Sequence, residues 1–357
     1  MHNTKLGKKI AFILSTNIGN DNFASEQEKS LVKRIDSLPN SEKINVSDLK
    51  TLKSAFSAAA ADDPYSVSPT YYALTGRRGL WLYKDEAENS DTTALLFCLH
   101  PNTQNTIMIF PPFGESPIES AMNLINDING NGIKFQIGRI IKDSNLEKTI
   151  SNKYSVQTER VVEDVLDWTF PVHTINCEAL TKREGKEYSR IRQTMNKFNR
   201  SETEIRDIDF KNDLPIIEKL ASSWEKNTDH YDDYDITFTE YFKNLVEIAN
   251  NEPNLGLKGI IVSIDGKDKG FSIWEPALNE GNTANLFASQ VSDFKMTNLA
   301  TYLTVKSAEQ ILEDGAQYIC LGGSENEGMD RYKRGFIPDK SIELTTIQIQ
   351  GTEYPEP

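Results

Sequence analysis

Short apolar runs separated by polar turns dominate the chain between residues 61 and 168. The runs are rich in β-branched or aromatic residues and are bounded by Asn, Asp, Ser and Gly, which is the pattern of β-strands. We expect strands at residues 79–84, 93–100, 106–114 and 133–141. A helix is expected over 116–132, because Ser116 can cap its start, Pro117 suits its first turn and the sequence NGNG ends it. Strands and helix together predict an α/β unit.

The second half of the chain repeats this order of strands and helices. Helical periodicity predicts helices at residues 184–200, 213–225, 238–250 and 298–315. Strand patterns lie at residues 170–180, 256–265, 270–276, 283–291, 318–323 and 341–349. The sequence GKDK lies between two of these strands and predicts a hairpin turn. The fold class we expect is α/β of the α+β kind, with two similar domains in tandem, each a mixed and mostly antiparallel sheet flanked by helices.

The length of the chain sets its expected division into domains. At about 150 residues per domain, 357 residues suffice for two. We expect a peripheral N-terminal extension at 1–60, an N-terminal domain at 61–168, and a C-terminal domain at 169–357 that carries the active site. Residues 64–76 mix aromatic residues with turn formers and are expected to form a loop and a short helix at the entry to a domain.

Composition argues against several classes of protein. The formal net charge of −14 disfavours non-specific binding to nucleic acid or to anionic membranes, although a local basic groove remains compatible with it. The cysteines are Cys98, Cys177 and Cys320. They are too few and too widely spaced for a disulfide framework, so we expect inert core thiols and a reducing compartment. The apolar run Ile10–Leu14 is shorter than a secretion signal or a membrane span requires, which favours a cytoplasmic protein.

Familiar catalytic signatures are missing from the sequence. It contains no GxxxxGK[ST], GxGxxG, HExxH or GxSxG motif and no zinc-type cysteine spacing. We therefore expect no metal and no tightly bound cofactor. The acidic stretch DHYDDYD at 229–235 lacks the glycine and glutamate of a calcium loop, and a solvated loop is the simpler interpretation.

The predicted helix at 184–200 reverses the charge of the chain locally. Residues 181–200 contain seven Lys or Arg and two Asp or Glu. At helical spacing, an apolar stripe consists of Tyr188, Ile191, Met195 and Phe198. The basic face consists of Arg183, Lys186, Arg190 and Lys197. Arg192 lies at the edge of the stripe, where an inward-pointing arginine needs an anionic partner, such as a substrate. These cations suit phosphate groups or RNA; an amphipathic helix with a solvated basic face is the alternative.

The stretch YICLGGSENEGMDRYKRGFIP joins an apolar strand to a cluster of cations. Gly322 and Gly323 end the strand, where the backbone must turn tightly or approach a ligand closely. Lys333 could point at a cleft beside the strand end, where an ammonium group stabilises an oxyanion or holds a phosphate. The candidate substrate-binding residues of this stretch are Ser324, Glu325 and Tyr332. A capped loop with surface cations is the alternative.

The strand GFSIWEP ends on Glu275, directly before Pro276. Alternation places Glu275 on the same face as Phe271 and Ile273. A carboxylate on an apolar face should have a raised pKa, which suits a general base for an amine. A strand-end glutamate paired with a nearby cation is the alternative. Trp274 is a further candidate substrate-binding residue, as a wall of the cleft, or else part of the core.

Taken in order, three stretches of the chain resemble one family. They are EGKEYSRIRQTMNKFNR, NLGLKGIIVSIDGKDKGFSIWEP and YICLGGSENEGMDRYKRGFIP. Together they resemble the tandem-GNAT proteins related to the catalytic domain of phosphatidylglycerol lysyltransferase, a group distantly related to Fem-type peptidyltransferases. The resemblance covers residues 64–338 and is strongest from residue 168 on.

This resemblance implies two GNAT folds packed side by side, with the working cleft mainly in the second. It also implies transfer of an acyl group, often an aminoacyl group from aminoacyl-tRNA, to an amine or a hydroxyl. The residues at family-like positions are Lys186, Arg190, Asn196, Glu275 and Lys333. The chain departs from the family at Ala288 and Ser289, where members often carry Glu-Lys. It also departs at SDFKMTNLA, which lacks the glycines that wrap pyrophosphate in acetyl-CoA enzymes.

The function we expect is that of an acyltransferase that moves an aminoacyl group from aminoacyl-tRNA to an amine or hydroxyl of a small molecule or peptide. Glu275 would accept a proton from the acceptor and Lys333 would stabilise the oxyanion, while the basic helix would take the phosphates of the donor. Two alternatives stay open. One is a non-catalytic ligand-binding protein on a degenerate scaffold. The other is an N-acyltransferase that uses acyl-CoA or a carrier protein. Neither DNA nor lipid headgroups are expected partners.

Overall fold

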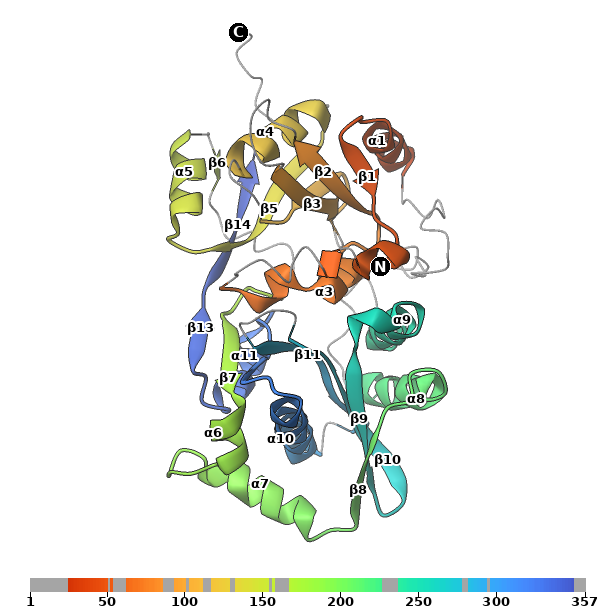
Figure 1. Ribbon diagram of the computed structural model, residues 1–357, viewed down its shortest axis with the longest axis vertical. Coiled ribbons are helices and arrows are strands. Elements are labelled where there is room, and N and C mark those ends of the chain that lie inside the picture. Colours follow the sequence, from red (N-terminus) through yellow and green to blue (C-terminus); the bar gives the residue numbers. More distant parts are fainter. Residues whose placement is uncertain are drawn as a thin grey trace, which may run out of the picture. The chain divides into compact units, whose positions relative to one another are not determined.

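The computed structural model divides into two units (Figure 1). The residues it describes are 25–50, 52–53, 62–85, 93–100, 103–111, 117–128, 132–153, 156–157, 167–226, 237–277, 282–293 and 296–349. Within these, the N-terminal unit consists of residues 25–45, 75–169 and 343–349, and the C-terminal unit of residues 46–74 and 170–342. Each unit therefore combines segments that are far apart in the sequence.

A seven-stranded sheet forms the centre of the N-terminal unit in the described part of the chain, with the strand order β1-β2-β3-β4-β5-β14-β6. The strands are β1 (Ser41–Lys43), β2 (Leu80–Asp85), β3 (Thr93–Leu99), β4 (Thr106–Ile109), β5 (Lys134–Ile141), β6 (Val156–Gln157) and β14 (Leu344–Ile349). Neighbouring strands are antiparallel except β4 and β5, which are parallel. The helices are α1 (Glu26–Asp36), α4 (Pro117–Ile128) and α5 (Asn145–Lys153). The strands expected at 79–84, 93–100 and 133–141 are confirmed. The strand expected at 106–114 ends at Ile109, and residues 112–114 lie outside the described residues. The helix expected at 116–132 is present as α4, and residues 116 and 129–131 lie outside the described residues.

The C-terminal unit has a second seven-stranded sheet among its described residues, with the order β13-β7-β12-β11-β10-β9-β8. The strands are β7 (Val172–Asn176), β8 (Thr203–Asp207), β9 (Lys258–Ile264), β10 (Lys267–Glu275), β11 (Thr283–Val291), β12 (Tyr318–Cys320) and β13 (Lys340–Ile342). Only β11 and β12 run parallel; the other neighbours are antiparallel. The expected fold class, two mixed and mostly antiparallel sheets with helices, is confirmed.

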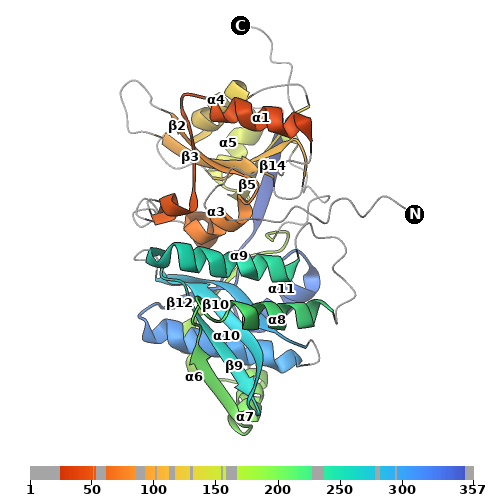
Figure 2. The same cartoon turned by 90° about the vertical axis from the view of Figure 1, so that its right-hand side faces the viewer.

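Helices pack against both sides of the C-terminal sheet. One core cluster joins the sheet to α6 (Cys177–Lys182), α7 (Ser189–Asn199) and α10 (Thr297–Glu313). The remaining long helices are α8 (Leu214–Glu225) and α9 (Phe238–Asn251), which run side by side across the strands (Figure 2). Phe242 of α9 meets Phe271 of β10 edge to face, with ring centroids 5.0 Å apart. The last helix, α11 (Glu327–Arg334), follows β12.

Residues 62–75 belong largely to the C-terminal unit, although in sequence they lie between β1 and β2 of the N-terminal sheet. They form the short helix η2 (Pro64–Val67) and the helix α3 (Pro69–Thr75). The Asp63 side chain accepts a hydrogen bond from the Tyr65 backbone N–H and so caps η2. The expected loop and short helix are present, and their packing partner is the distant strand β11.

The helix expected at 184–200 is shorter than its periodicity suggests. Arg183 adopts a left-handed conformation with φ of 53° and ends α6, and Gly185 follows with φ of 89°. Because these conformations are incompatible with a continuous helix, α7 starts only at Ser189. The expected apolar stripe is confirmed: Tyr188, Ile191, Met195 and Phe198 are all buried in the core cluster.

The strand expected at 341–349 is two strands in two different sheets. Lys340–Ile342 form β13, which pairs with β7 in the C-terminal unit. Leu344–Ile349 form β14, which lies between β5 and β6 in the N-terminal unit. Glu343, between them, is exposed. A continuous apolar pattern does not reveal this switch, because both strands bury side chains.

Candidate active site

Glu275, the last residue of β10, is completely buried. The Ser68 hydroxyl donates to its Oε2 at 2.5 Å, and the Thr70 hydroxyl donates to its Oε1, also at 2.5 Å. The Thr70 backbone N–H donates to the same Oε1 at 3.2 Å. Burial raises the pKa of Glu275, while the hydrogen bonds from Ser68 and Thr70 act to lower it. The carboxyl group therefore combines the desolvation expected of a general base with a complete set of protein donors.

Asn285 of β11 lies directly opposite Glu275 in the strand pairing. Its Nδ2 donates to the Pro64 carbonyl at 3.2 Å, and its Oδ1 is buried without a hydrogen-bond partner among the described residues. Beside it, the Tyr65 hydroxyl donates to the Leu286 carbonyl at 2.5 Å. Residues 64–70 thus bind to the adjoining ends of β10 and β11 through hydrogen bonds to both strands.

The glycine pair after β12 meets the same segment. Gly322 has φ of 69°, and a Cβ atom there would lie 3.4 Å from the Tyr65 ring. The positive φ favours glycine here, because other residues adopt this conformation with strain. Two residues later, the Ser324 hydroxyl is buried and has no hydrogen-bond partner among the described residues. A buried hydroxyl without a partner is a natural place for a ligand to bond.

Lys333 reaches this turn from α11. Its ammonium group donates to the Gly323 carbonyl, and its side chain is partly buried. The helix that carries it begins with Asn326, whose side chain accepts from the Met329 backbone N–H at 2.9 Å. Lys333 therefore bonds to the residue that directly precedes Ser324 in this turn.

Tyr332 and Glu325 flank this turn. The Tyr332 hydroxyl lies 3.5 Å from the Thr304 hydroxyl of α10, and its ring packs edge to face on Phe336, with centroids 5.2 Å apart. Burial raises the pKa of Tyr332 to about 12, so this phenol stays protonated at neutral pH. Glu325 is partly buried at the start of the loop. Tyr332 thus anchors α11 to α10.

Glu275 and Lys333 do not bond to each other. Within the described residues, no hydrogen bond or ion pair joins the two side chains: Glu275 bonds to residues 68–70 and Lys333 to residue 323. The Tyr65 side chain lies between the two places, since it contacts both Leu286 and Gly322. The two candidate catalytic groups therefore belong to one region of the sheet without direct contact.

The cations predicted for the helix at 184–200 fall into two groups. Arg183 is partly buried and pairs with Glu309 of α10 at 2.8 Å, and Arg192 donates to the backbone carbonyls of Arg183 and Gly185. Both hold the turn between α6 and α7. The exposed cations are Lys186, Arg190 and Lys197. The partner of Arg192 is thus a pair of protein carbonyls.

The C-terminal end of α7 lies far from Glu275 along the sheet. It leads into β8, whose Thr203 pairs with Ile264 beside the β9–β10 hairpin (Figure 1). Glu275 lies at the opposite end of β10, a nine-residue strand of about 30 Å. Lys197, near this end of α7, is therefore not part of the Glu275 environment.

Trp274 belongs to the core. It is 1% exposed and packs in the cluster with α10, with its Nε1 buried and without a hydrogen-bond partner among the described residues.

Sequence reasoning missed Tyr65, Ser68, Thr70 and Asn285. The first three lie in the stretch YSVSPT, whose Ser and Thr next to Pro indicated only a turn.

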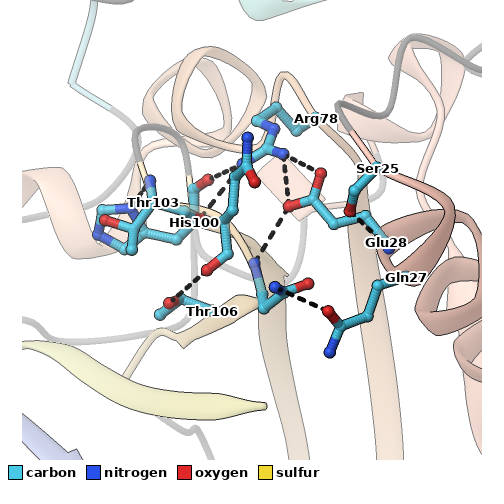
Figure 3. A network of polar contacts seen from close by, with 9 residues as sticks. Ser25, Gln27, Glu28, Arg78, His100, Thr103 and Thr106 are labelled. Atoms are coloured by element: carbon cyan, nitrogen blue, oxygen red, sulfur yellow. Dashed lines mark hydrogen bonds and ion pairs between the residues drawn. The ribbon is translucent and has the colours of Figure 1, made fainter. Parts of the chain in front are cut away.

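A second buried polar cluster lies in the N-terminal unit (Figure 3). Glu28 of α1 is completely buried, and Arg78 donates to its two carboxylate oxygens at 2.7 and 2.6 Å. Arg78 also donates to the His100 carbonyl at 2.7 Å, and the Asn105 backbone N–H donates to Glu28 at 3.2 Å. Because each charge is matched within the cluster, its role is to tie α1 to the loops around the sheet.

The other candidate chemistries find little support. The thiols of Cys98, Cys177 and Cys320 are buried, and burial raises the pKa of Cys98 and Cys177 to about 12, as expected of inert core thiols. Among the described residues, no group of three His, Cys, Asp or Glu is arranged to hold a metal ion. The acidic stretch at 229–235 lies outside the described residues. No helix in the described part of the chain is long and apolar enough to cross a membrane.

Comparison with known proteins gives one family and several similar structures. Residues 173–344 match the family described as "Phosphatidylglycerol lysyltransferase, C-terminal". A conserved protein of unknown function from Bacteroides thetaiotaomicron has a TM-score of 0.65 at 16% identity, over 87% of this chain and 99% of that chain. L-PGS from Bacillus licheniformis has a TM-score of 0.60 at 10% identity, over 88% and 95%.

FemX is a third similar structure, with a TM-score of 0.55 at 11% identity, over 87% of this chain and 97% of that chain. At such identities these structures establish the fold. No curated protein sequence matches the chain significantly. The family match covers β7 to β13, the segment that contains both Glu275 and Lys333.

Proposed function

We propose that this chain, whose residues 173–344 match the phosphatidylglycerol lysyltransferase C-terminal family, is an acyltransferase that moves an aminoacyl group from aminoacyl-tRNA to an amine or hydroxyl. The observation that carries the proposal is the turn after β12, within the segment that matches the family. There the Lys333 ammonium group donates to the Gly323 carbonyl, and the next residue, Ser324, has a buried hydroxyl without a hydrogen-bond partner among the described residues. The acceptor we propose is a small molecule or peptide, because the net charge of −14 disfavours an anionic lipid surface.

The chemistry is attack of the acceptor on the ester carbonyl of the aminoacyl group. The acceptor nitrogen or oxygen forms a bond to the carbonyl carbon, and its proton passes to the Glu275 carboxylate. Lys333 stabilises the oxyanion of the tetrahedral intermediate, which collapses and releases the ribose hydroxyl of the tRNA with a proton. Ser324 and Glu325 contact the aminoacyl group, Arg192 and Tyr332 hold the surrounding helices, and Trp274 supports the strand that ends on Glu275.

Lys186, Arg190 and Lys197 contribute the surface for the donor RNA, with Arg183 holding the turn beside them. All three are exposed on an otherwise acidic chain. Phosphate contacts need no deep groove, so a helix with an exposed basic face suffices for them.

The test is transfer of a radiolabelled amino acid from a pool of charged tRNA to a panel of amines, hydroxyl compounds and peptides. We expect product formation that ribonuclease abolishes. Lys333→Ala and Glu275→Gln should each reduce the rate by about 10²–10⁴-fold, as expected for loss of oxyanion stabilisation or of a general base.

Arg331→Ala is the matched control, because Arg331 is an exposed cation of the same helix that pairs only with Glu327 in the described structure. It should retain activity. Full activity in both the Lys333 and the Glu275 variants contradicts the assignment of roles. Activity that survives ribonuclease and requires acyl-CoA or an acyl carrier protein favours the CoA-type alternative. Binding of aminoacyl-tRNA without turnover favours a binding protein.

A further inference from the structure

Three polar side chains of the C-terminal unit, none of them assigned a role in aminoacyl transfer, are linked to one another beside the turn after β12. Ser341 of β13 stands directly opposite His173 of β7 in the strand pairing. The Ser341 hydroxyl lies 2.8 Å from His173 Nδ1, and His173 Nε2 lies 2.8 Å from Asp330 Oδ1 of α11. Serine, imidazole and carboxylate from three elements are thus linked in series.

Which atoms donate and which accept among these three side chains follows from the protonation of the carboxylate and the imidazole. The Asp330 carboxylate can only accept, so His173 Nε2 carries a proton and donates it. Burial lowers the pKa of His173, which favours the neutral ring, and a neutral ring with a protonated Nε2 has Nδ1 as an acceptor. The Ser341 O–H therefore donates to Nδ1. The second oxygen of Asp330 accepts from Arg334 Nε at 2.8 Å, which fixes the carboxylate.

This order of contacts is that of an activated serine. A nucleophile, a base within hydrogen-bond reach and an acid that orients the base are the three parts the chemistry requires. In the best-known serine hydrolases the serine meets Nε2 and the acid meets Nδ1. Here the ring nitrogens are exchanged, and the roles are unchanged because either nitrogen of a neutral imidazole can accept the proton.

The burial of the three residues suits the same division of roles. Ser341 is exposed, whereas His173 is 1% and Asp330 4% exposed. Strand β13 is also the outermost strand in the order of the C-terminal sheet, within the described residues. A reagent can therefore approach the hydroxyl from solvent while the base stays protected from water. Burial, and after it the positive charge of Lys333 and Arg334, lower the pKa of His173, which favours the neutral ring that a base requires.

We propose that Ser341 is a nucleophile, with His173 as its general base and Asp330 as the positioning residue of the imidazole, and that this site takes small activated acyl esters. The Ser341 oxygen forms a bond to the ester carbonyl carbon as its proton passes to His173 Nδ1. The intermediate then breaks the bond to the alcohol oxygen, which leaves with that proton. The acyl-serine that remains is cleaved by water, which yields the carboxylic acid and restores the hydroxyl. This activity needs no RNA.

The test uses an alkyl fluorophosphonate, which forms a stable adduct with activated serines and releases fluoride. The full-length protein is treated at neutral pH and examined by intact-mass measurement and peptide mapping. We expect one adduct, on Ser341, and none in Ser341→Ala. Hydrolysis of p-nitrophenyl acetate should fall by about 10²-fold in the same variant, the size typical of losing the acid–base machinery.

Ser189→Ala is the matched control, because Ser189 is an exposed serine that starts α7. It should be labelled like the wild type. His173→Gln, checked for folding by circular dichroism, should lose the adduct while Ser341 remains present. No adduct on Ser341 under conditions that fully label an authentic serine esterase overturns the proposal. So does labelling spread over several serines, or ester hydrolysis unchanged in Ser341→Ala. Because Ser341 is exposed on an outer strand, its alanine variant is expected to fold.

Discussion

The buried environment of Glu275 could be predicted from the sequence, but its hydrogen-bond partners could not. Its place on an apolar strand face correctly indicated a raised pKa, because the end of β10 is buried on both faces. Its hydrogen bonds come from Ser68 and Thr70, which lie 207 and 205 residues away in the sequence. No local pattern can supply such partners.

The raised pKa of Glu275 makes stability depend on pH. Its folded pKa lies above the ordinary value of 4.5, so the folded protein binds a proton that the unfolded chain has released between the two values. The stability it contributes is fully present below pH 4.5 and is lost as pH rises through the folded pKa. Glu275→Gln removes this pH-dependent contribution to stability. The free energy of unfolding of the variant should therefore increase relative to that of the wild type as pH rises from 4.5 to 8.

Urea denaturation of both proteins across this range measures the shift. Glu184→Gln, at an exposed position, serves as the control and should show no such trend. A difference between Glu275→Gln and wild type that is the same at every pH would falsify the raised pKa.

At the scale of elements, α7 illustrates what periodicity can and cannot predict. The buried stripe of the helix was predictable, because spacing on a helix fixes which side chains share a face. The start of the helix was not, because Arg183 takes a left-handed conformation that the following turn imposes. That turn also explains Arg192, whose guanidinium group donates to two backbone carbonyls of the turn between α6 and α7.

The exposed cations of α7 lead to a prediction about RNA. The double variant Arg190→Glu/Lys197→Glu should weaken binding of tRNA and reduce its salt dependence, because a protein that neutralises fewer phosphates releases fewer counterions on binding. We expect the slope of log affinity against log salt to fall in magnitude by about 1–2. Fluorescence anisotropy with labelled tRNA between 50 and 200 mM salt, as applied concentrations, measures it.

The control for this experiment is Lys267→Glu, an exposed lysine at the start of β10. It should leave the salt dependence unchanged. If the α7 variant binds tRNA with the wild-type slope, the basic surface of α7 does not bind the RNA.

At the scale of the whole molecule, each unit depends on segments that a division by sequence would separate. Residues 64–70 supply the donors to Glu275 in the C-terminal unit, and Leu344–Ile349 supply a strand to the N-terminal sheet. The predicted domain boundaries at residues 60 and 168 remain a proposal. Division at these boundaries would separate residues 64–70 and Leu344–Ile349 from the units to which they belong.

A fragment of residues 169–357 should therefore not fold cooperatively. It leaves the buried Glu275 carboxyl without Ser68 and Thr70, which costs the several kcal/mol typical of an uncompensated buried polar group. It also leaves β14 without its partner β5. Circular dichroism and thermal unfolding of the fragment, with the full chain as reference, measure this. A sharp transition like that of the full chain contradicts the expectation.

The sequence by itself determined the local elements: the strands, the helices, the buried stripe of α7 and the thiols of the core. These depend on the spacing of apolar residues along a few turns or strand steps, and that spacing is written in the chain. Only the tertiary structure decided which distant groups meet. The donors of Glu275, the separate sheets of β13 and β14, and the contact of Ser341 with His173 and Asp330 all depend on how strands from remote segments pair. Such pairing is selected by the fit of whole sheets and helices, so residues that carry no local signal became neighbours.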